Sequence, residues 1–253
     1  MQVALAQMKV EGGFPDRNRA RACRRIEQSA SLGSDLVLLP EALDFGWTHP
    51  SAKDAAGTIP GGETFEALSQ AAKKSGVFVC AGLVELCGER LFNSAVLIDR
   101  EGELLLCHRK INELEIAHDL YSLGSDANAA CETELAPIGL QVCADGFAEG
   151  QWISRRLCDL GARIILMPCA WAVDSDFDPT EEPYGKIWRD NLGPVARERG
   201  VWILACSNVG PITAGPWRGR NCIGNSLVFD PDGNEVLVGP FGEDADDLLL
   251  VDI

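Results

Sequence analysis

Three residues that can act as an acid, a cation and a nucleophile each follow an apolar run of the sequence. Glu41 comes directly after "LVLLP", Lys110 after "LLLCHR" and Cys143 after "IGLQV". Side chains at strand ends in α/β folds are held by a rigid sheet and still reach a surface crevice. A thiol beside a base or a cation can serve as a nucleophile. The three positions together therefore predict a cysteine-dependent active site.

Each residue taken singly has a more ordinary interpretation. A strand-end Glu or Lys is usually solvated or paired at the surface, and a free Cys in an apolar run behaves as a small hydrophobe. Cys143 is one of 10 cysteines, and none of them forms a CxxC pair. This spacing gives no support to a zinc or thioredoxin-type motif. The chemical prediction depends on the three residues acting together.

The elements that position these residues alternate between apolar strands and helices. The run "SDLVLLPEA" is continuous and apolar, which is typical of a strand buried on both faces. Strands are expected at 2–7, 34–42, 77–85, 94–99, 103–110, 139–145, 163–171 and 201–210, with a closing hairpin at 225–239. Helices are expected at 15–33, 61–76, 149–162 and 184–200, and a short one at 113–121.

This alternation predicts a layered α/β fold with mixed sheets. The strand–helix–strand waves near 3–40 and 139–207 resemble each other, which indicates two related halves. Because no low-complexity linker separates the halves, residues 1–253 are expected to form a single domain.

The order of the motifs resembles the nitrilase superfamily of carbon–nitrogen hydrolases. The resemblance is carried by "LLPEALDFGW", "HRKINELE" and "IGLQVCADGF", and it extends over nearly the whole chain. It implies a four-layer α-β-β-α sandwich with two mixed β-sheets and a catalytic triad of Glu41, Lys110 and Cys143. Glu41 would exchange protons with the thiol and water, whereas Lys110 and the backbone N–H of Ala144 would stabilise an oxyanion.

The chain departs from the family pattern beyond the lysine, where many members carry a second glutamate. The stretch "KINELEIAHDLYSLG" places His118 at the corresponding position. Glu113 and Glu115 are alternatives, of which we prefer Glu115, and His118 is a candidate for positioning the substrate. Trp171 lies where the family lines its pocket, although a Trp in such a run is commonly part of the core.

The resemblance implies hydrolysis of a small amide or N-carbamoyl compound through a cysteine thioester, with no cofactor or metal. A nitrilase and an acyltransferase variant remain open alternatives, as does a catalytically silent oligomeric scaffold. A homodimer or higher homo-oligomer is expected. The net charge of −16 argues against binding to nucleic acid or membranes. Many free thiols and a strand-like N-terminus without a basic segment predict a cytoplasmic protein.

Overall fold

The computed structural model describes residues 1–181 and 183–253, and its centre is a pair of six-stranded sheets. The first sheet has the order β15 (Asp247–Asp252), β1 (Gln2–Gln7), β2 (Leu36–Leu38), β3 (Phe78–Cys87), β4 (Arg90–Ile98) and β5 (Leu104–Arg109). The second has the order β14 (Glu235–Val238), β13 (Leu227–Phe229), β10 (Trp202–Ser207), β8 (Ile164–Cys169), β7 (Ile138–Leu140) and β6 (Ala130–Cys131).

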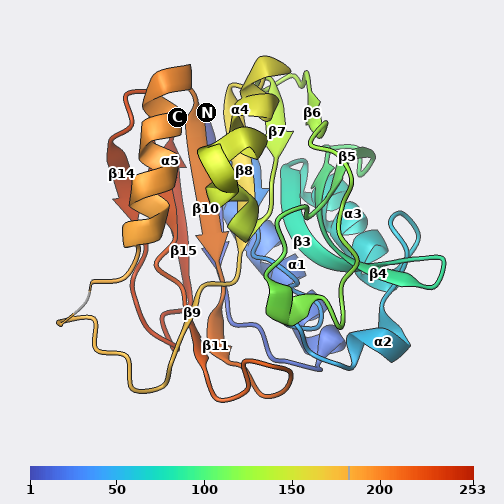
Figure 1. The fold of residues 1–253 in the computed structure, drawn as a ribbon. Helices are drawn as coiled ribbons and strands as arrows, with labels where there is room; N and C mark the ends of the chain where they lie inside the picture. Colours follow the sequence, from blue (N-terminus) through green and yellow to red (C-terminus); the bar gives the residue numbers. More distant parts are fainter. Residues whose placement is uncertain (182) are drawn as a thin grey trace.

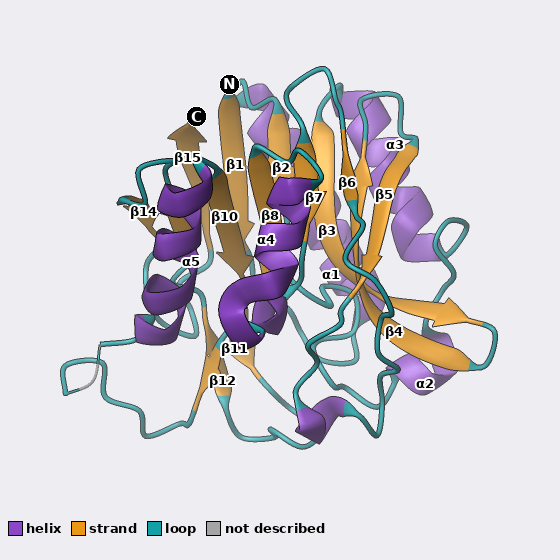
Figure 2. Ribbon diagram, turned by 45° about the horizontal axis from the view of Figure 1, so that its top comes forward, coloured by secondary structure: helices purple, strands orange, loops and turns teal. Residues whose placement is uncertain are grey.

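Helices cover the outer faces of both sheets (Figure 2). On the first sheet lie α1 (Pro15–Ser31) and α3 (Glu63–Ser75), and on the second lie α4 (Trp152–Asp159) and α5 (Lys186–Arg199). The predicted four-layer α-β-β-α sandwich with two mixed sheets is therefore confirmed. Among the described residues, no helix is long and apolar enough to cross a bilayer.

Both sheets have the same strand pattern. Each contains three parallel strands, β1–β2–β3 in one and β7–β8–β10 in the other, continued by two antiparallel strands. An antiparallel edge strand, β15 or β6, completes each sheet. The similar halves of the sequence thus correspond to two sheets of equivalent topology.

Burial on two faces explains the continuous apolar run of β2. Leu36 and Leu38 face the layer between the sheets, whereas Val37 and Leu39 pack with α1 and α3. Because successive side chains of a strand point to opposite faces, both sets must be apolar. The same inner layer includes residues of β8 and β10, so the two sheets share one core.

Smaller elements close the end of the sandwich at which the chemistry-bearing residues lie. A three-stranded sheet is formed by β11 (Val209–Pro211), β12 (Asn221–Ile223) and β9 (Ala172–Val173), and α2 (Ala52–Ala55) is a single turn (Figure 1). The expected short helix at 113–121 is only a 3₁₀ turn, Glu115–Ala117. Strand β7 ends earlier than predicted, at Leu140, and Cys143 begins a 3₁₀ helix that runs to Phe147.

Candidate active site

Glu41, Lys110 and Cys143 line one small cavity of about 110 Å³. They arrive from three strands: Glu41 follows β2, Lys110 follows β5 and Cys143 follows β7. The backbone N–H of Glu41 also donates to the carbonyl of Cys169, 3.1 Å away at the end of β8, and so ties the two sheets together here. A glycine in β3 permits this approach, since a Cβ on Gly82 would lie 2.5 Å from the Glu41 Cα.

A buried lysine between two glutamates forms the polar end of the cavity. The Lys110 ammonium donates to Glu41 Oε1 at 2.8 Å and to Glu113 Oε1 at 2.9 Å. The amide of Asn93 on β4 donates to the same two carboxylates, at 2.6 Å to Glu41 and 3.0 Å to Glu113. With both carboxylates ionised, the cluster carries one net negative charge.

Burial and mutual charge set the protonation of this cluster. Burial raises the pKa of Glu41, and the Lys110 charge offsets only part of that rise. Burial alone would lower the pKa of Lys110, but the charges of Glu113, Glu41 and Cys143 outweigh it and hold the pKa well above its usual value. Lys110 therefore remains an ammonium, whereas Glu41 is suited to take up a proton.

Cys143 is presented by a strained turn. Its φ of 42° lies in the left-handed region, which a residue with a side chain adopts at an energetic cost. The residue is 9% exposed and lines the cavity together with Ala144, which follows it in the same 3₁₀ helix. Its sulfur also contacts the thiol of Cys169, whose pKa burial raises well above the usual value.

Asp145 fastens this turn to the loop that carries Lys110. Its carboxylate accepts from the backbone N–H groups of Ile111 at 3.1 Å, Asn112 at 2.8 Å and Val142 at 2.9 Å. Its Oδ2 also lies 2.8 Å from Nε2 of the buried His108. Burial raises the pKa of Asp145, but the contact with His108 and these N–H donors outweigh it and hold the pKa below its usual range. The carboxylate thus fixes the thiol relative to the ammonium.

Aromatic side chains form the remaining walls of the cavity. Trp171 stacks on Trp188 of α5 with ring centroids 4.6 Å apart, and Phe147 packs against Trp188 at 5.2 Å. Tyr184 lies 6.1 Å from the Trp171 ring. Trp47 and Trp217 contact each other at 4.7 Å and complete the lining. The polar cluster is therefore enclosed by apolar surface.

The structure corrects one residue assignment beyond the lysine. Glu115, our preferred second acid, is exposed on a 3₁₀ turn, and the carboxylate beside Lys110 is that of Glu113. His118 is exposed as well, with Nε2 lying 3.2 Å from the Glu113 carbonyl. Neither Glu115 nor His118 is among the described residues that line the cavity. Trp171 lines the cavity and is also part of the core.

Several residues of the site were missed from the sequence. Asn93 interrupts an apolar strand, which is a signal of a buried polar role. Glu113 was named from the sequence as an alternative, and its spacing of three residues after Lys110 was the signal that could have favoured it. Tyr184 and Trp188 had no such signal, because both fall in the helix expected at 184–200, and its pattern does not indicate which side chains reach the cavity. Among the described residues, no group of His, Cys, Asp or Glu side chains is arranged to hold a metal ion.

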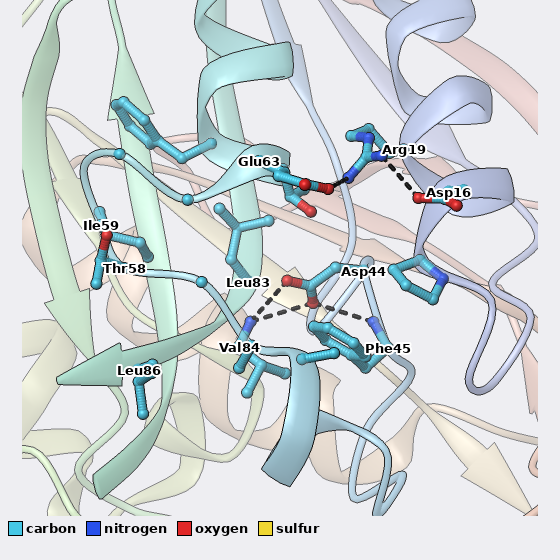
Figure 3. Close-up of a pocket in the computed structure, with 18 residues that line it drawn as sticks. Asp16, Arg19, Asp44, Phe45, Thr58, Ile59, Glu63, Leu83, Val84 and Leu86 are labelled. Atoms are coloured by element: carbon cyan, nitrogen blue, oxygen red, sulfur yellow. Dashed lines mark hydrogen bonds and ion pairs between the residues drawn. The ribbon is translucent and has the colours of Figure 1, made fainter. Parts of the chain in front are cut away.

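A second and larger cavity, of about 570 Å³, lies between the α1, α3 and β3 regions (Figure 3). Its buried carboxylate belongs to Asp44, which accepts from the backbone N–H groups of Val84 and Phe45, each at 3.1 Å. Burial raises the pKa of Asp44 from 3.8 to about 7. Arg19 pairs with Glu63 and Asp16 at its edge. Among the described residues that line this cavity there is no cysteine, lysine or histidine.

Comparisons with known proteins agree with this geometry. The sequence profile of the family described as carbon-nitrogen hydrolase matches residues 2–253. A nitrilase of Pyrococcus abyssi is 28% identical over 91% of this chain and 82% of its own length. An ω-amidase of Xenopus laevis is 30% identical over 67% of this chain and 63% of its own length.

Solved structures show the same fold. A carbon-nitrogen hydrolase from Helicobacter pylori superimposes with a TM-score of 0.86 at 20% identity, over 99% of this chain and 88% of the other. An amidase of the nitrilase superfamily from Nesterenkonia superimposes with a TM-score of 0.83 at 21% identity, over 100% of this chain and 90% of the other.

Proposed function

We propose, from the premise that the chain belongs to the carbon-nitrogen hydrolase family, that it hydrolyses a small amide through a thioester on Cys143. The observation that carries the proposal is the convergence of Glu41, Lys110 and Cys143 on one small cavity with mostly apolar walls. Two buried carboxylates and a buried ammonium are costly to desolvate, so a fold that keeps them beside a thiol gains little stability from them. A role in catalysis explains why the protein keeps these buried charges.

The first half of the reaction transfers the acyl group to the enzyme. Glu41 takes the thiol proton as the sulfur attacks the amide carbon, and the raised pKa of Glu41 helps it to hold that proton. The Lys110 ammonium and the N–H of Ala144 stabilise the negative oxygen of the tetrahedral intermediate. Glu41 then gives its proton to the leaving nitrogen, so that ammonia departs and a thioester remains.

The second half returns the enzyme to its starting state. Glu41 removes a proton from a water molecule as the water oxygen attacks the thioester carbon. The C–S bond breaks, the sulfur regains the proton, and the carboxylic acid leaves. Glu113 and Asn93 hold Lys110 and Glu41 in place through both halves, which limits the reorganisation that each step requires.

The relatives support an amide as the substrate. Several of the curated relatives are ω-amidases. A mutant of the Nesterenkonia amidase carries the acetamide moiety of fluoroacetamide on its active-site cysteine. The Pyrococcus abyssi relative bears the name nitrilase, so a nitrile is the second candidate substrate, and it would react at the same thiol.

An ammonia-release screen over small amides, carbamoyl amino acids and nitriles tests the proposal. Cys143→Ala serves as the blank, and Cys107→Ser, which alters an exposed thiol of β5, is the matched control. We expect release from at least one amide to fall more than about 1000-fold in Cys143→Ala, since loss of a nucleophile removes the covalent route. Cys107→Ser should retain activity. If no compound releases ammonia above the blank, the proposed function is wrong and a silent scaffold is favoured.

A further inference from the structure

The distribution of charged side chains around the small cavity restricts the charge that a bound acyl group can carry. Among the described residues, the only charged side chains that line the cavity are Glu41 and Lys110. Both belong to the polar cluster at the reacting end, where Glu113 supplies a second carboxylate to the same ammonium. The positive charge of Lys110 is therefore already compensated by two carboxylates before a substrate binds.

The opposite walls of the cavity are aromatic. They offer flat apolar surfaces that are packed together, with Trp171 stacked on Trp188 and Trp47 against Trp217. The one hydroxyl among the described residues of these walls, that of Tyr184, accepts from the Trp188 indole N–H at 3.2 Å and retains its own O–H as a donor. The aromatic wall consists of Trp47, Phe147, Trp171, Tyr184, Trp188 and Trp217.

The cation nearest the aromatic wall, Arg220, is not free to pair with a carboxylate on the substrate. The Arg220 guanidinium lies over the outer Trp217 ring, 4.4 Å from its centroid. It is paired with both carboxylate oxygens of Asp174, at 2.8 and 3.3 Å. Arg220 is not among the described lining residues, and its charge is compensated where it stands.

A carboxylate on the acyl chain would find no free cation to pair with among the described lining residues, and the neutral donors of the walls are the Tyr184 hydroxyl and the indole N–H groups of Trp47 and Trp171, which have no acceptor. It would lose its hydration against aromatic surface and lie close to a cluster with one net negative charge. An apolar group of the same shape would lose nothing by desolvation and would gain contact with the rings. The cavity thus favours an uncharged acyl group over a negatively charged one of equal size.

The volume favours a small substrate. The cavity of about 110 Å³ is partly open to solvent, and its inner part has room for only a short acyl group beside the reacting amide. We propose, on the basis of the amidase function above, that the substrate is a small amide whose acyl group is uncharged and apolar. Amides with a carboxylate on the acyl chain are excluded from the site.

The test compares 4-methylpentanamide with succinamate, in which a carboxylate replaces the isopropyl group of nearly the same shape. Ammonia release by the wild-type protein should give a kcat/KM at least about 100-fold higher for 4-methylpentanamide, since an unpaired buried charge is strongly penalised. A cationic amide, 4-aminobutanamide, forms the third arm and should also be at least about tenfold poorer, because its ammonium loses hydration.

A charge-introducing variant sharpens the comparison. Ala172 lines the cavity at β9 and is half-buried, so Ala172→Arg should place a cation near the aromatic wall. We expect the preference for 4-methylpentanamide over succinamate to fall at least about tenfold in Ala172→Arg, because the added cation pairs with the carboxylate. Ala172→Met, which adds length without charge, should keep the preference and is the matched control.

The outcomes separate the two claims. If succinamate or 4-aminobutanamide is hydrolysed by the wild-type protein as efficiently as 4-methylpentanamide, the inference about the acyl group is overturned and the amidase function stands. If none of the three amides releases ammonia above the Cys143→Ala blank while another amide of the screen does, the inference about the acyl group is overturned and the amidase function stands. If no amide of the screen does, both are overturned.

Discussion

Two of the cavities lined by described residues, the small one beside Cys143 and a larger one beside Asp44, differ in size, and the larger one holds fewer groups that could take part in a reaction. The larger one, about 570 Å³, contains a single buried carboxylate, that of Asp44, held by backbone N–H groups. The smaller one, about 110 Å³, brings a carboxylate, an ammonium and a thiol together from three strand ends. Volume therefore says little about where chemistry takes place, and the convergence of opposite charges beside a nucleophile says more.

The short segment after β2 contributes one buried carboxylate to each of the two cavities. Glu41 enters the small cavity, and Asp44, three residues later, lies in the wall of the large one. Burial raises the pKa of both carboxylates, yet only Glu41 has a cation beside it. A perturbed pKa alone thus does not mark a catalytic residue, and the partners of the group decide its role.

After the loss of the thiol in Cys143→Ala, the largest effect on activity in the small cavity is expected from Glu113→Gln. This substitution keeps the shape but removes one of the two carboxylates that hold Lys110, so kcat/KM for an amide should fall about 100-fold. Glu115→Gln is the matched control on the exposed 3₁₀ turn and should change kcat/KM less than about twofold. Steady-state kinetics measures both. Equal losses in the two variants would contradict the assignment of Glu113.

A smaller effect is expected from Asp145→Asn, behind the wall of the small cavity. The variant weakens the tie between the Cys143 turn and the Lys110 loop, so kcat/KM should fall about tenfold. The free energy of unfolding should fall by about 3 kcal/mol at pH 7, because a neutral amide replaces a buried carboxylate that accepts from three backbone N–H groups and contacts His108. Chemical denaturation measures the second quantity.

The pH dependence of this variant follows from the lowered pKa of Asp145. The carboxylate stabilises the folded protein above the unfolded-state pKa, near 4, and this stabilisation is lost as the pH falls through the lower folded-state value. The difference in unfolding free energy between wild type and Asp145→Asn should therefore shrink in acid. A difference that stays constant down to pH 2 would show that Asp145 does not act through its charge.

The smallest effect on activity is expected from Asp44→Asn in the large cavity, with kcat/KM within about twofold of wild type. Its effect on stability should instead depend on pH. The folded protein holds the Asp44 proton up to about pH 7, whereas the unfolded chain releases it near 3.8. The contribution of Asp44 to stability is thus present below about pH 4 and is lost as the pH rises to 7.

Denaturation curves between pH 4 and 8 measure this contribution. Over that range the wild type should lose up to about 4 kcal/mol relative to Asp44→Asn, from about three pKa units at 1.36 kcal/mol each. A tenfold loss of kcat/KM in Asp44→Asn would contradict the separation of the two cavities.

Much of the fold could be predicted from the sequence, because buried strands appear as continuous or alternating apolar runs. The continuous apolar run at β2 and the hairpin signal between β4 and β5 both predicted elements that the structure contains. The last strand, β15, was missed, although its residues pair along the whole of β1. Its exposed and half-buried positions lack the apolar continuity that identified its neighbours.

Only part of the site could be predicted from the sequence, because some of its residues follow strands whereas others lie in a loop or depend on long-range packing. Glu41, Lys110 and Cys143 follow strands, so periodicity located them. Glu113 lies in a loop, where the choice between it and Glu115 depends on the path of the backbone, and no periodic pattern reports that path. The aromatic wall depends on long-range packing, which brings Trp188 of α5 against Phe147 of another segment.

Trapping the acyl-enzyme tests the central claim most directly. Wild-type protein would be mixed with 4-methylpentanamide, quenched in acid during turnover, digested and mapped by mass spectrometry. The account predicts a 4-methylpentanoyl adduct on the peptide that contains Cys143 and on none of the peptides with the other cysteines. An adduct on a different cysteine, together with undiminished ammonia release by Cys143→Ala, would contradict it.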